Sequence, residues 1–418
     1  MMATDRKLSY KVPTTIITDR LVSQEARRNK ALEDQKRRRA QRVDSSRQLD
    51  LFADLHLGPS DDDEPEIVRE GVASFASMVG PSNLPPDITP VRGLLEPKEI
   101  GKSKKKGKKK KRVKTDGAKP SKWADNCMYA ELLEMRGDDT WNETGRGDGL
   151  PEDLETGWVA VAPVPVGKRC LAVTHQSSGV VGVVPNTSLR SRVLGKPLMV
   201  PFPSNLPPQT ILDCILDPDW RDNGIVHVLD VLQWKGQDVA DCETPFRFWW
   251  RDTRLAELPR SLPPSNPTVS SSKITSDLPN TSSGYQFPYP TTFLAIPYFT
   301  NTSLPFLSSH VIPLARSLRS VSVDVPLPVV PTAPAEPTMD VDGSLPPLQA
   351  LTSLPVILQS DGLLLYVAQA SYEPGTSPLS SWIPITEYGS GASGGERPLD
   401  LFDRCVYSWF KSLPKLTS

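Results

Sequence analysis

Residues 361–382, DGLLLYVAQASYEPGTSPLSSW, end on a tryptophan whose indole ring could bind a flat ligand by stacking. Within this stretch, residues 363–367 have the apolar, β-prone composition of a buried strand. A loop rich in proline and glycine follows at 373–378, and Trp382 comes after it. A tryptophan in such a place is either a core anchor or a platform on which a flat ring stacks. The stretch alone leaves both interpretations open.

The composition indicates that only part of the chain can fold into a core that positions such a ring. The 418 residues include 43 prolines, and only 7% of them are aromatic, which predicts one folded core and much chain outside it. The five cysteines are scattered without a C-x-x-C pair, so we expect reduced thiols and neither a disulfide framework nor a zinc site. With no apolar run of about 18 residues and no signal peptide, the sequence predicts a soluble intracellular protein.

The positive charge is concentrated in two segments, although the net charge of the chain is −1. Residues 19–47 carry ten Lys/Arg and five acidic residues, and residues 102–114 carry ten Lys/Arg and no acidic residue. The first segment lies in a region, 19–57, without glycine or proline, which predicts a helix. Its apolar positions are sparse, so we expect no face buried in its own core. It is either a solvated charged helix or an arm that folds on an acidic partner, protein or RNA.

Residues 58–122 have the composition of a linker. They are first acidic, then proline-rich, and end near the run KSKKKGKKKKRVK. This run is compatible with a nuclear-targeting patch, a contact to polyanions or a solubilising tail.

Folding signals begin near Trp123 and predict a mainly antiparallel α+β core. Strands are expected at 159–164, 170–174, 210–216, 226–234, 246–251 and 293–298. A helix is expected at 304–318 and a short amphipathic one at 399–410, and two proline-rich inserts fall at about 258–285 and 324–347. The chain then divides into an arm (8–57), a linker (58–122), a folded domain (123–390) and a C-terminal tail (391–418).

Four segments of the folded part resemble the snurportin family. They are VPVGKRCLAV (164–173), TILDCILD (210–217), HVLDVLQWKGQDVADCETPFRFWW (227–250) and SDGLLLYVAQASYEPGTSPLSSW (360–382). Snurportins are nuclear import adaptors that bind the trimethylguanosine cap of spliceosomal snRNAs and link the snRNPs to importin-β. The resemblance implies this function here, without a membrane partner, a metal or another cofactor, and with shuttling between nucleus and cytoplasm. It also implies a fold like the nucleotidyltransferase domain of mRNA capping enzymes.

The basic arm also resembles the importin-β-binding helix of that family. The residues that the resemblance implies for contacts with acidic surfaces of the receptor are Arg27, Arg28, Lys30, Arg37, Arg38, Arg39 and Arg42. The family's extreme N-terminus carries a hydrophobic signal for an export receptor. Here the corresponding MMATDRKLSYKVP is short and polar, which leaves an export receptor as an open alternative.

A capping-enzyme-like nucleotidyltransferase is the rival hypothesis, because those enzymes use a lysine nucleophile in Lys-x-Asp-Gly. In the matching turn Val164 stands in place of the lysine and Val166 in place of the aspartate, and Ile215 replaces a carboxylate farther on. Residues 114–117 do spell Lys-Thr-Asp-Gly, but they precede every expected strand, so we interpret them as a chance match. No catalytic residue is therefore expected. A general RNA-binding protein that uses its basic segments is a further alternative.

The resemblance implies a pocket for a positively charged, methylated guanine followed by a phosphate bridge. The residues implied for it are Trp382, Val164, Lys168, Arg169 and Leu132. Trp382 would stack on the base. Lys168 and Arg169 would face the phosphates, although charged residues after a turn are often merely solvated. Leu132 occupies the place of a second pocket tryptophan in the family, with Trp141 a few residues on.

Overall fold

The structure is a computed structural model of the chain. It describes residues 23–49, 121–135, 149–175, 185–264, 285–327, 350–386 and 396–412. Residues 1–42 and 119–418 belong to one compact unit, which contains the elements discussed below apart from residues 43–49, and residues 43–118 belong to a second. The lysine run, the Lys-Thr-Asp-Gly match at 114–117, Trp141 and the first 22 residues lie outside the described part.

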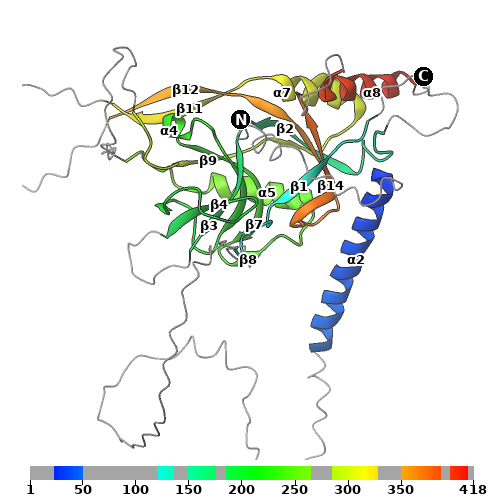
Figure 1. The fold of residues 1–418 in the computed structure, drawn as a ribbon, viewed down its shortest axis with the longest axis horizontal. Helices are drawn as coiled ribbons and strands as arrows, with labels where there is room; N and C mark the ends of the chain where they lie inside the picture. The colour runs from blue at the N-terminus through cyan, green and yellow to red at the C-terminus, as the bar shows by residue number, and fades with distance from the viewer. Residues whose placement is uncertain are drawn as a thin grey trace, which may run out of the picture. The chain divides into compact units, whose positions relative to one another are not determined.

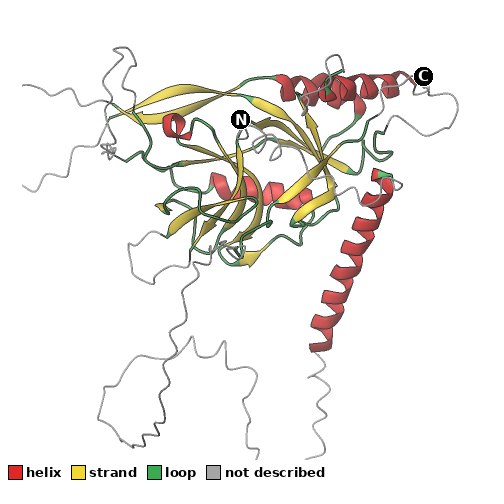
Figure 2. Ribbon diagram, viewed as in Figure 1, coloured by secondary structure: helices red, strands yellow, loops and turns green. Residues whose placement is uncertain are grey.

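The first of two large β-sheets has five strands in the order β1-β14-β13-β2-β10. Figure 1 labels β1, β2 and β14 of this sheet, and Figure 2 draws the strands in yellow. They are β1 (Met128–Leu132), β14 (Gly375–Pro384), β13 (Ser360–Val367), β2 (Trp158–Pro165) and β10 (Tyr298–Phe299). All neighbours are antiparallel except β1, which runs parallel to β14. Strand β2 is buried along its whole length, as its continuous apolar sequence WVAVAPVP predicts.

The second large sheet has the order β5-β4-β3-β6-β7-β8, with β9 added parallel to β7. Its strands are β3 (Lys168–Thr174), β4 (Asn186–Ser191), β5 (Phe202–Pro203), β6 (Ile211–Leu216), β7 (Ile225–Trp234), β8 (Gln237–Asp238) and β9 (Thr292–Ala295). The expected hairpin of β6 and β7 is confirmed. Strands β2 and β3 belong to different sheets and are joined by Val166 and Gly167 alone, so this turn carries the chain from one sheet to the other.

A two-stranded ribbon and several helices complete the unit. The ribbon pairs β11 (Arg319–Pro326) with β12 (Leu351–Leu358). The helical segments are α4 (Trp220–Asn223), α5 (Thr244–Ala256), α6 (Leu304–Phe306), the π-helix η2 (Leu307–Val311), α7 (Ile312–Arg316) and α8 (Pro398–Ser412). The helices expected at 304–318 and 399–410 are thus confirmed, and α8 buries Leu399, Phe402 and Val406 against the domain. The expected mainly antiparallel α+β fold is confirmed as well.

None of the described helices is long and apolar enough to cross a membrane. Among the residues that the structure describes, no group of three His, Cys, Asp or Glu side chains could hold a metal ion.

Residues 246–251, expected as a strand, lie within helix α5, so that prediction is wrong. The buried residues of α5 recur at helical spacing: Thr244, Arg247, Phe248 and Arg251. Pro245 lies in the first turn, where the missing amide hydrogen removes no helical hydrogen bond. The aromatic run suggested a strand, but Phe246 and Trp249 are 41% and 51% exposed and contribute nothing to a buried face.

The segment before Trp382 also differs from the expected loop. Strand β14 begins at Gly375, so Trp382 lies inside a strand and not at the end of a loop. The polar composition suggested a loop, but Ser377, Ser380 and Ser381 are buried, and each pairs with a residue of a neighbouring strand.

The basic arm forms helix α2 (Gln24–Leu49), which confirms the expected helix. The expectation that this helix buries no face in its own core is wrong. Gln24, Arg28 and Gln35 are buried, and Ala31 and Leu32 pack against the hydrophobic core. The buried positions are mostly polar, which is why a search for apolar periodicity missed them.

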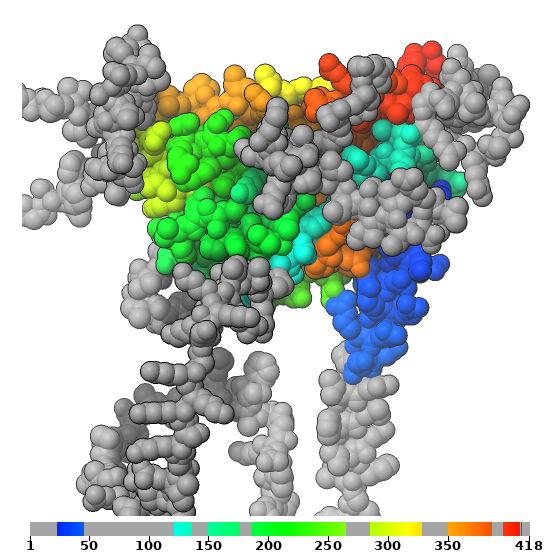
Figure 3. All heavy atoms as spheres, in the orientation of Figure 1, coloured from blue at the N-terminus to red at the C-terminus, as the bar shows by residue number. Residues whose placement is uncertain are grey.

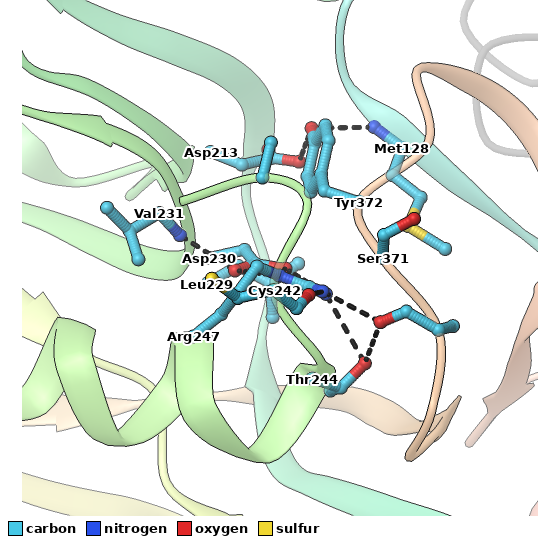
Figure 4. Close-up of polar contacts among 12 residues, drawn as sticks. Met128, Asp213, Leu229, Asp230, Val231, Cys242, Thr244, Arg247, Ser371 and Tyr372 are labelled. Atoms are coloured by element: carbon cyan, nitrogen blue, oxygen red, sulfur yellow. Dashed lines mark hydrogen bonds and ion pairs between the residues drawn. The ribbon is translucent and has the colours of Figure 1, made fainter. Parts of the chain in front are cut away.

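A buried ion pair fixes α5 to the second sheet. The Arg247 guanidinium is fully buried and donates to both carboxylate oxygens of Asp230 on β7, at 3.0 to 3.2 Å. Nη1 of Arg247 also donates to the carbonyl oxygens of Cys242 at 2.7 Å and Ala370 at 2.8 Å (Figure 4). Arg247 therefore ties α5, β7 and the loop after β13 together.

Replacing Arg247 by alanine should destabilise the domain by about 3–5 kcal/mol, because Asp230 would keep a buried charge without its partner. Urea denaturation measures this change in the free energy of unfolding. Arg254→Ala on the same helix is the control. Arg254 pairs with Glu257 at the surface, where the side chains are 30% and 55% exposed, so its loss should cost about 1 kcal/mol or less. Equal losses for the two variants would contradict the structural role of Arg247.

Candidate binding site

A cavity of about 750 Å³ lies where the two large sheets meet. From the first sheet its walls come from β1, β2, β13 and β14, and from the second sheet they come from β3, β4, β6 and the turn after β4. Its apolar lining includes Val164, Val193, Leu194, Ile215, Leu364 and Trp382. Asp361 is the only acidic residue among the described residues that line it. The cavity can therefore enclose a largely apolar group.

Trp382 is held in the cavity wall by strand pairing on both sides. On β14 it lies opposite Leu364 of β13 and opposite Leu132 of β1. The residue is 9% exposed, belongs to the main hydrophobic core and also lines the cavity. Trp382 is therefore a core residue that also borders the cavity, and its use as a stacking platform stays a prediction.

Gly362 on β13 allows the indole to lie this close to the sheet. Its φ is +155°, and a Cβ there would come within 2.3 Å of the carbonyl oxygen of Ile383 and 2.8 Å of Cη2 of Trp382. Any side chain at this position would push the ring or the neighbouring strand away. The absence of a side chain at Gly362 therefore permits the observed position of Trp382.

Arg169, at the start of β3, makes a bidentate ion pair with Asp213 of β6. Its Nε and Nη2 atoms donate to the two carboxylate oxygens at 2.6 and 2.8 Å. Burial lowers the pKa of Arg169, but the charge of Asp213, the nearby Tyr366 and the hydrogen bonds to Asp213 together raise this pKa well above its ordinary value. Nη2 also donates to the carbonyl oxygen of Met128 at 3.2 Å, so most donors of this guanidinium are already engaged.

Tyr372 completes the group around Asp213 (Figure 4). Its hydroxyl donates to Asp213 Oδ2 at 2.6 Å and accepts the backbone N–H of Met128 at 2.8 Å. Met128 begins β1 and lines the cavity. The buried carboxylate therefore fixes both Arg169 and the first residue of a cavity-lining strand.

Three cationic side chains lie around the rim of the cavity: Lys168, Arg192 and Lys196. Strands β3 and β4 are antiparallel with Cys170 opposite Ser191, which brings the start of β3 next to the end of β4. Lys168 and Lys196 are exposed. This rim can attract a chain of phosphates.

The turn that carries Arg192 and Lys196 is held by β1 and by the segment before it. The guanidinium of Arg192 lies 4.4 Å from the ring centre of Tyr129, and the carbonyl oxygen of Arg192 accepts the N–H of Asp125 at 3.1 Å. Gly195 has φ +60°, and a Cβ there would lie 2.5 Å from the backbone of Trp123. This close approach requires glycine, so the turn is rigidly placed.

Four of the five pocket residues expected from the sequence line the cavity: Trp382, Val164, Lys168 and Arg169. Leu132 does not line it, although it pairs with Trp382 across the strands. Tyr129, Arg192 and Lys196 line it and were missed. No local pattern marks these three, because only the pairing of β1 with β14 and of β3 with β4 brings them to the cavity.

The comparison with known families agrees with this geometry. Residues 148–267 match the family model described as "Snurportin1, m3G cap-binding domain". The matched segment contains β2, β3, β4, β6 and β7, and with them Val164, Lys168, Arg169 and the turn with Arg192. Trp382 lies beyond the matched residues, so its place in the same cavity is a finding of the structure.

Gly362→Ala should destabilise the domain by about 2 kcal/mol or more beyond the effect of Gly375→Ala. Both glycines have a positive φ, but a Cβ at 375 meets no atom within 4 Å, whereas one at 362 meets Ile383 and Trp382. The difference between the two variants therefore isolates the close approach of the indole, and thermal and urea unfolding measure it. Equal stability of the two variants would show that the ring does not need the glycine.

Proposed function

Because residues 148–267 make the chain a snurportin-like protein with a domain for the m3G cap, we propose that the cavity beside Trp382 holds the trimethylguanosine base of capped snRNA. We further propose that the chain is a nuclear import adaptor, which carries spliceosomal snRNPs by binding importin-β. One observation carries the proposal: a tryptophan ring, an apolar wall and a cationic rim meet in one cavity at the matched domain.

The apolar wall suits a hypermethylated base. Methylation at N2 removes hydrogen-bond donors and adds apolar surface, and methylation at N7 makes the ring cationic. Stacking on Trp382 would supply on the order of 1–3 kcal/mol, and the cationic ring would add a cation–π term of about 0.5–2 kcal/mol. Asp361, in the same wall, favours a positive ring over a neutral one.

The cationic rim suits the phosphate bridge of a cap. Arg169 already donates to Asp213 and Met128, so it contributes mainly a fixed positive charge. Direct contacts to phosphate would then come from Lys168 and Lys196, which are exposed, together with Arg192. The base end and the phosphate end of the ligand would thus meet different walls of one cavity.

The cavity supports binding over nucleotidyl transfer. The matched domain type belongs to a binding family without enzymatic activity. Covalent transfer in capping enzymes needs a lysine amine as nucleophile. Val164, at the matching position, and Ile215, where a carboxylate is expected, both line the cavity with hydrocarbon only.

The adaptor role rests on helix α2. It carries the seven basic residues proposed for importin-β: Arg27, Arg28, Lys30, Arg37, Arg38, Arg39 and Arg42. A basic helix is the form in which such a segment can contact an acidic receptor surface along its length. Import of capped snRNPs implies that the chain shuttles between cytoplasm and nucleus, with an export receptor as a further partner.

Trp382→Leu should weaken binding of a trimethylguanosine cap analogue by roughly tenfold to a hundredfold, because the stacking surface is lost. Trp382→Phe should recover part of that affinity, since a smaller ring still stacks. Fluorescence titration measures the affinity, and a thermal melt confirms that each variant is folded. Trp249→Leu is the control, because Trp249 lies on α5 outside the cavity and is 51% exposed. A folded Trp382→Leu protein with full affinity would contradict the proposal.

The double variant Lys168→Gln/Lys196→Gln should weaken binding of the complete cap analogue but leave binding of trimethylguanosine nucleoside unchanged. The reason is that these lysines face phosphates and not the base. The slope of log K against log salt should become shallower by roughly 1–2 units for the complete analogue. Arg260→Gln removes an exposed cation that does not line the cavity and should change neither affinity. Equal losses for analogue and nucleoside would contradict the assignment of the rim.

A further inference from the structure

One face of helix α2 packs along the domain that carries the cavity. The residues of α2 that contact the domain are Gln24, Arg27, Arg28, Ala31, Leu32, Gln35, Arg38, Arg39 and Arg42. They recur every three or four positions, which places them on a single stripe of the helix. A stripe of contacts that continues over about five helical turns is typical of a specific interface between a helix and a domain.

The N-terminal turn of α2 is bound to the end of β1. Gln24 donates to the carbonyl oxygen of Leu132 at 2.9 Å and accepts the N–H of Glu134 at 3.1 Å. Arg27 forms ion pairs with Glu131 at 3.0 Å and Glu134 at 2.8 Å. Backbone and side chains of the same short segment thus recognise this turn.

The middle of the stripe is buried. Arg28 is 6% exposed, and its guanidinium lies 5.1 Å from the ring centre of Trp158. Gln35 exchanges two hydrogen bonds with the backbone of Ser371: its Oε1 accepts at 3.0 Å and its Nε2 donates at 3.3 Å. Because Gln35 is buried and hydrogen-bonded to this backbone, it favours one position of the helix on the domain.

The last part of the stripe meets two acidic residues. Arg38 pairs with Glu373 at 2.7 Å, Arg39 donates to the carbonyl oxygen of Asp241 at 3.0 Å, and Arg42 pairs with the Asp241 carboxylate. Figure 3 shows the blue atoms of the helix beside orange atoms of the chain segment that includes Glu373.

We propose that the domain is itself a receptor for the basic arm and that this docking competes with importin-β. Five of the seven arm residues proposed for importin-β face the domain: Arg27, Arg28, Arg38, Arg39 and Arg42. Lys30 and Arg37 are exposed and point elsewhere. The identity of the competing partner rests on the proposed function, whereas the docking itself does not.

Docking of α2 on the domain would weaken the binding of importin-β to the chain. Arg27, Arg28, Arg38, Arg39 and Arg42 cannot contact importin-β and the domain at the same time, so only the undocked fraction of the chain can use all of the proposed arm residues. The apparent affinity for importin-β is reduced by that fraction. Surface ion pairs are individually weak, so the docked state can open readily, and the exposed Lys30 and Arg37 can make the first contact.

Charge reversal on the domain tests the docking without touching the arm. In the full chain, the triple variant Glu134→Lys/Glu373→Lys/Asp241→Lys removes acidic partners of Arg27, Arg38 and Arg42. Amide hydrogen exchange of residues 24–42 should become at least about tenfold faster in this variant, while cap affinity and melting temperature stay near their original values. Unchanged exchange of these amides would overturn the docking.

A matched control separates docking from net charge. Asp219→Lys/Asp222→Lys/Glu257→Lys makes the same change in charge at exposed positions that do not contact α2. Its arm amides should exchange as in the original chain. Faster exchange in this control as well would show a general charge effect and would overturn the proposed interface.

Binding of importin-β tests the competition. The first triple variant should bind importin-β about fivefold to tenfold more tightly than the original chain, and the control variant should not. Equal affinities for all three chains, with importin-β bound, would overturn the competition. If no chain binds importin-β, the proposed import role fails and competition with it; hydrogen exchange then still decides whether the arm docks.

Discussion

The candidate site depends on one buried carboxylate. Asp213 is completely buried in the second sheet and would be very costly there without partners. It has two: Arg169 from the neighbouring strand, at 2.6 and 2.8 Å, and the Tyr372 hydroxyl at 2.6 Å. Tyr372 in turn accepts the N–H of Met128, the first residue of β1. A single charge thus connects the two sheets beside the cavity, which Arg169 and Met128 line.

The residues that line the cavity therefore have different roles. Arg169 neutralises the charge of Asp213 and is held by it, so its role is mainly structural. Lys168 and Lys196 are more exposed and are available to a ligand. The first sheet contributes the indole of Trp382 and the apolar residues around it. The second contributes the turn after β4, which carries Arg192 and Lys196. Val164 and Ile215, which the sequence comparison aligned with a lysine and a carboxylate of capping enzymes, line the cavity with hydrocarbon side chains. Such a lining is suited to binding.

The sequence predicted those parts of the fold that depend on local pattern. Apolar runs identified β2, β3, β6, β7 and β13, and the resemblance to snurportins pointed to four residues that line the cavity. The predictions were wrong where contacts between residues far apart in the sequence determine which side chains are buried. Arg247 and Arg251 are buried on α5 because Asp230 and backbone carbonyls satisfy them, so the hidden face of that helix is partly charged. The docked stripe of α2 was missed for the same reason, since Gln24 and Gln35 bind backbone groups more than 100 residues away. Arg192 and Lys196 reach the cavity only through strand pairing, which no local pattern reveals.

The central claim is that this cavity distinguishes a hypermethylated cap. Isothermal titration of the full chain with trimethylguanosine and with monomethylguanosine cap analogues tests it most directly. The two analogues carry the same phosphate bridge and the same N7 charge, so they differ only in the N2 methyl groups that would meet the apolar wall. We predict tighter binding of the trimethyl analogue, by roughly tenfold or more, since two buried methyl groups contribute about 0.8 kcal/mol each. Equal affinity for both analogues, or no binding of either, would contradict the account.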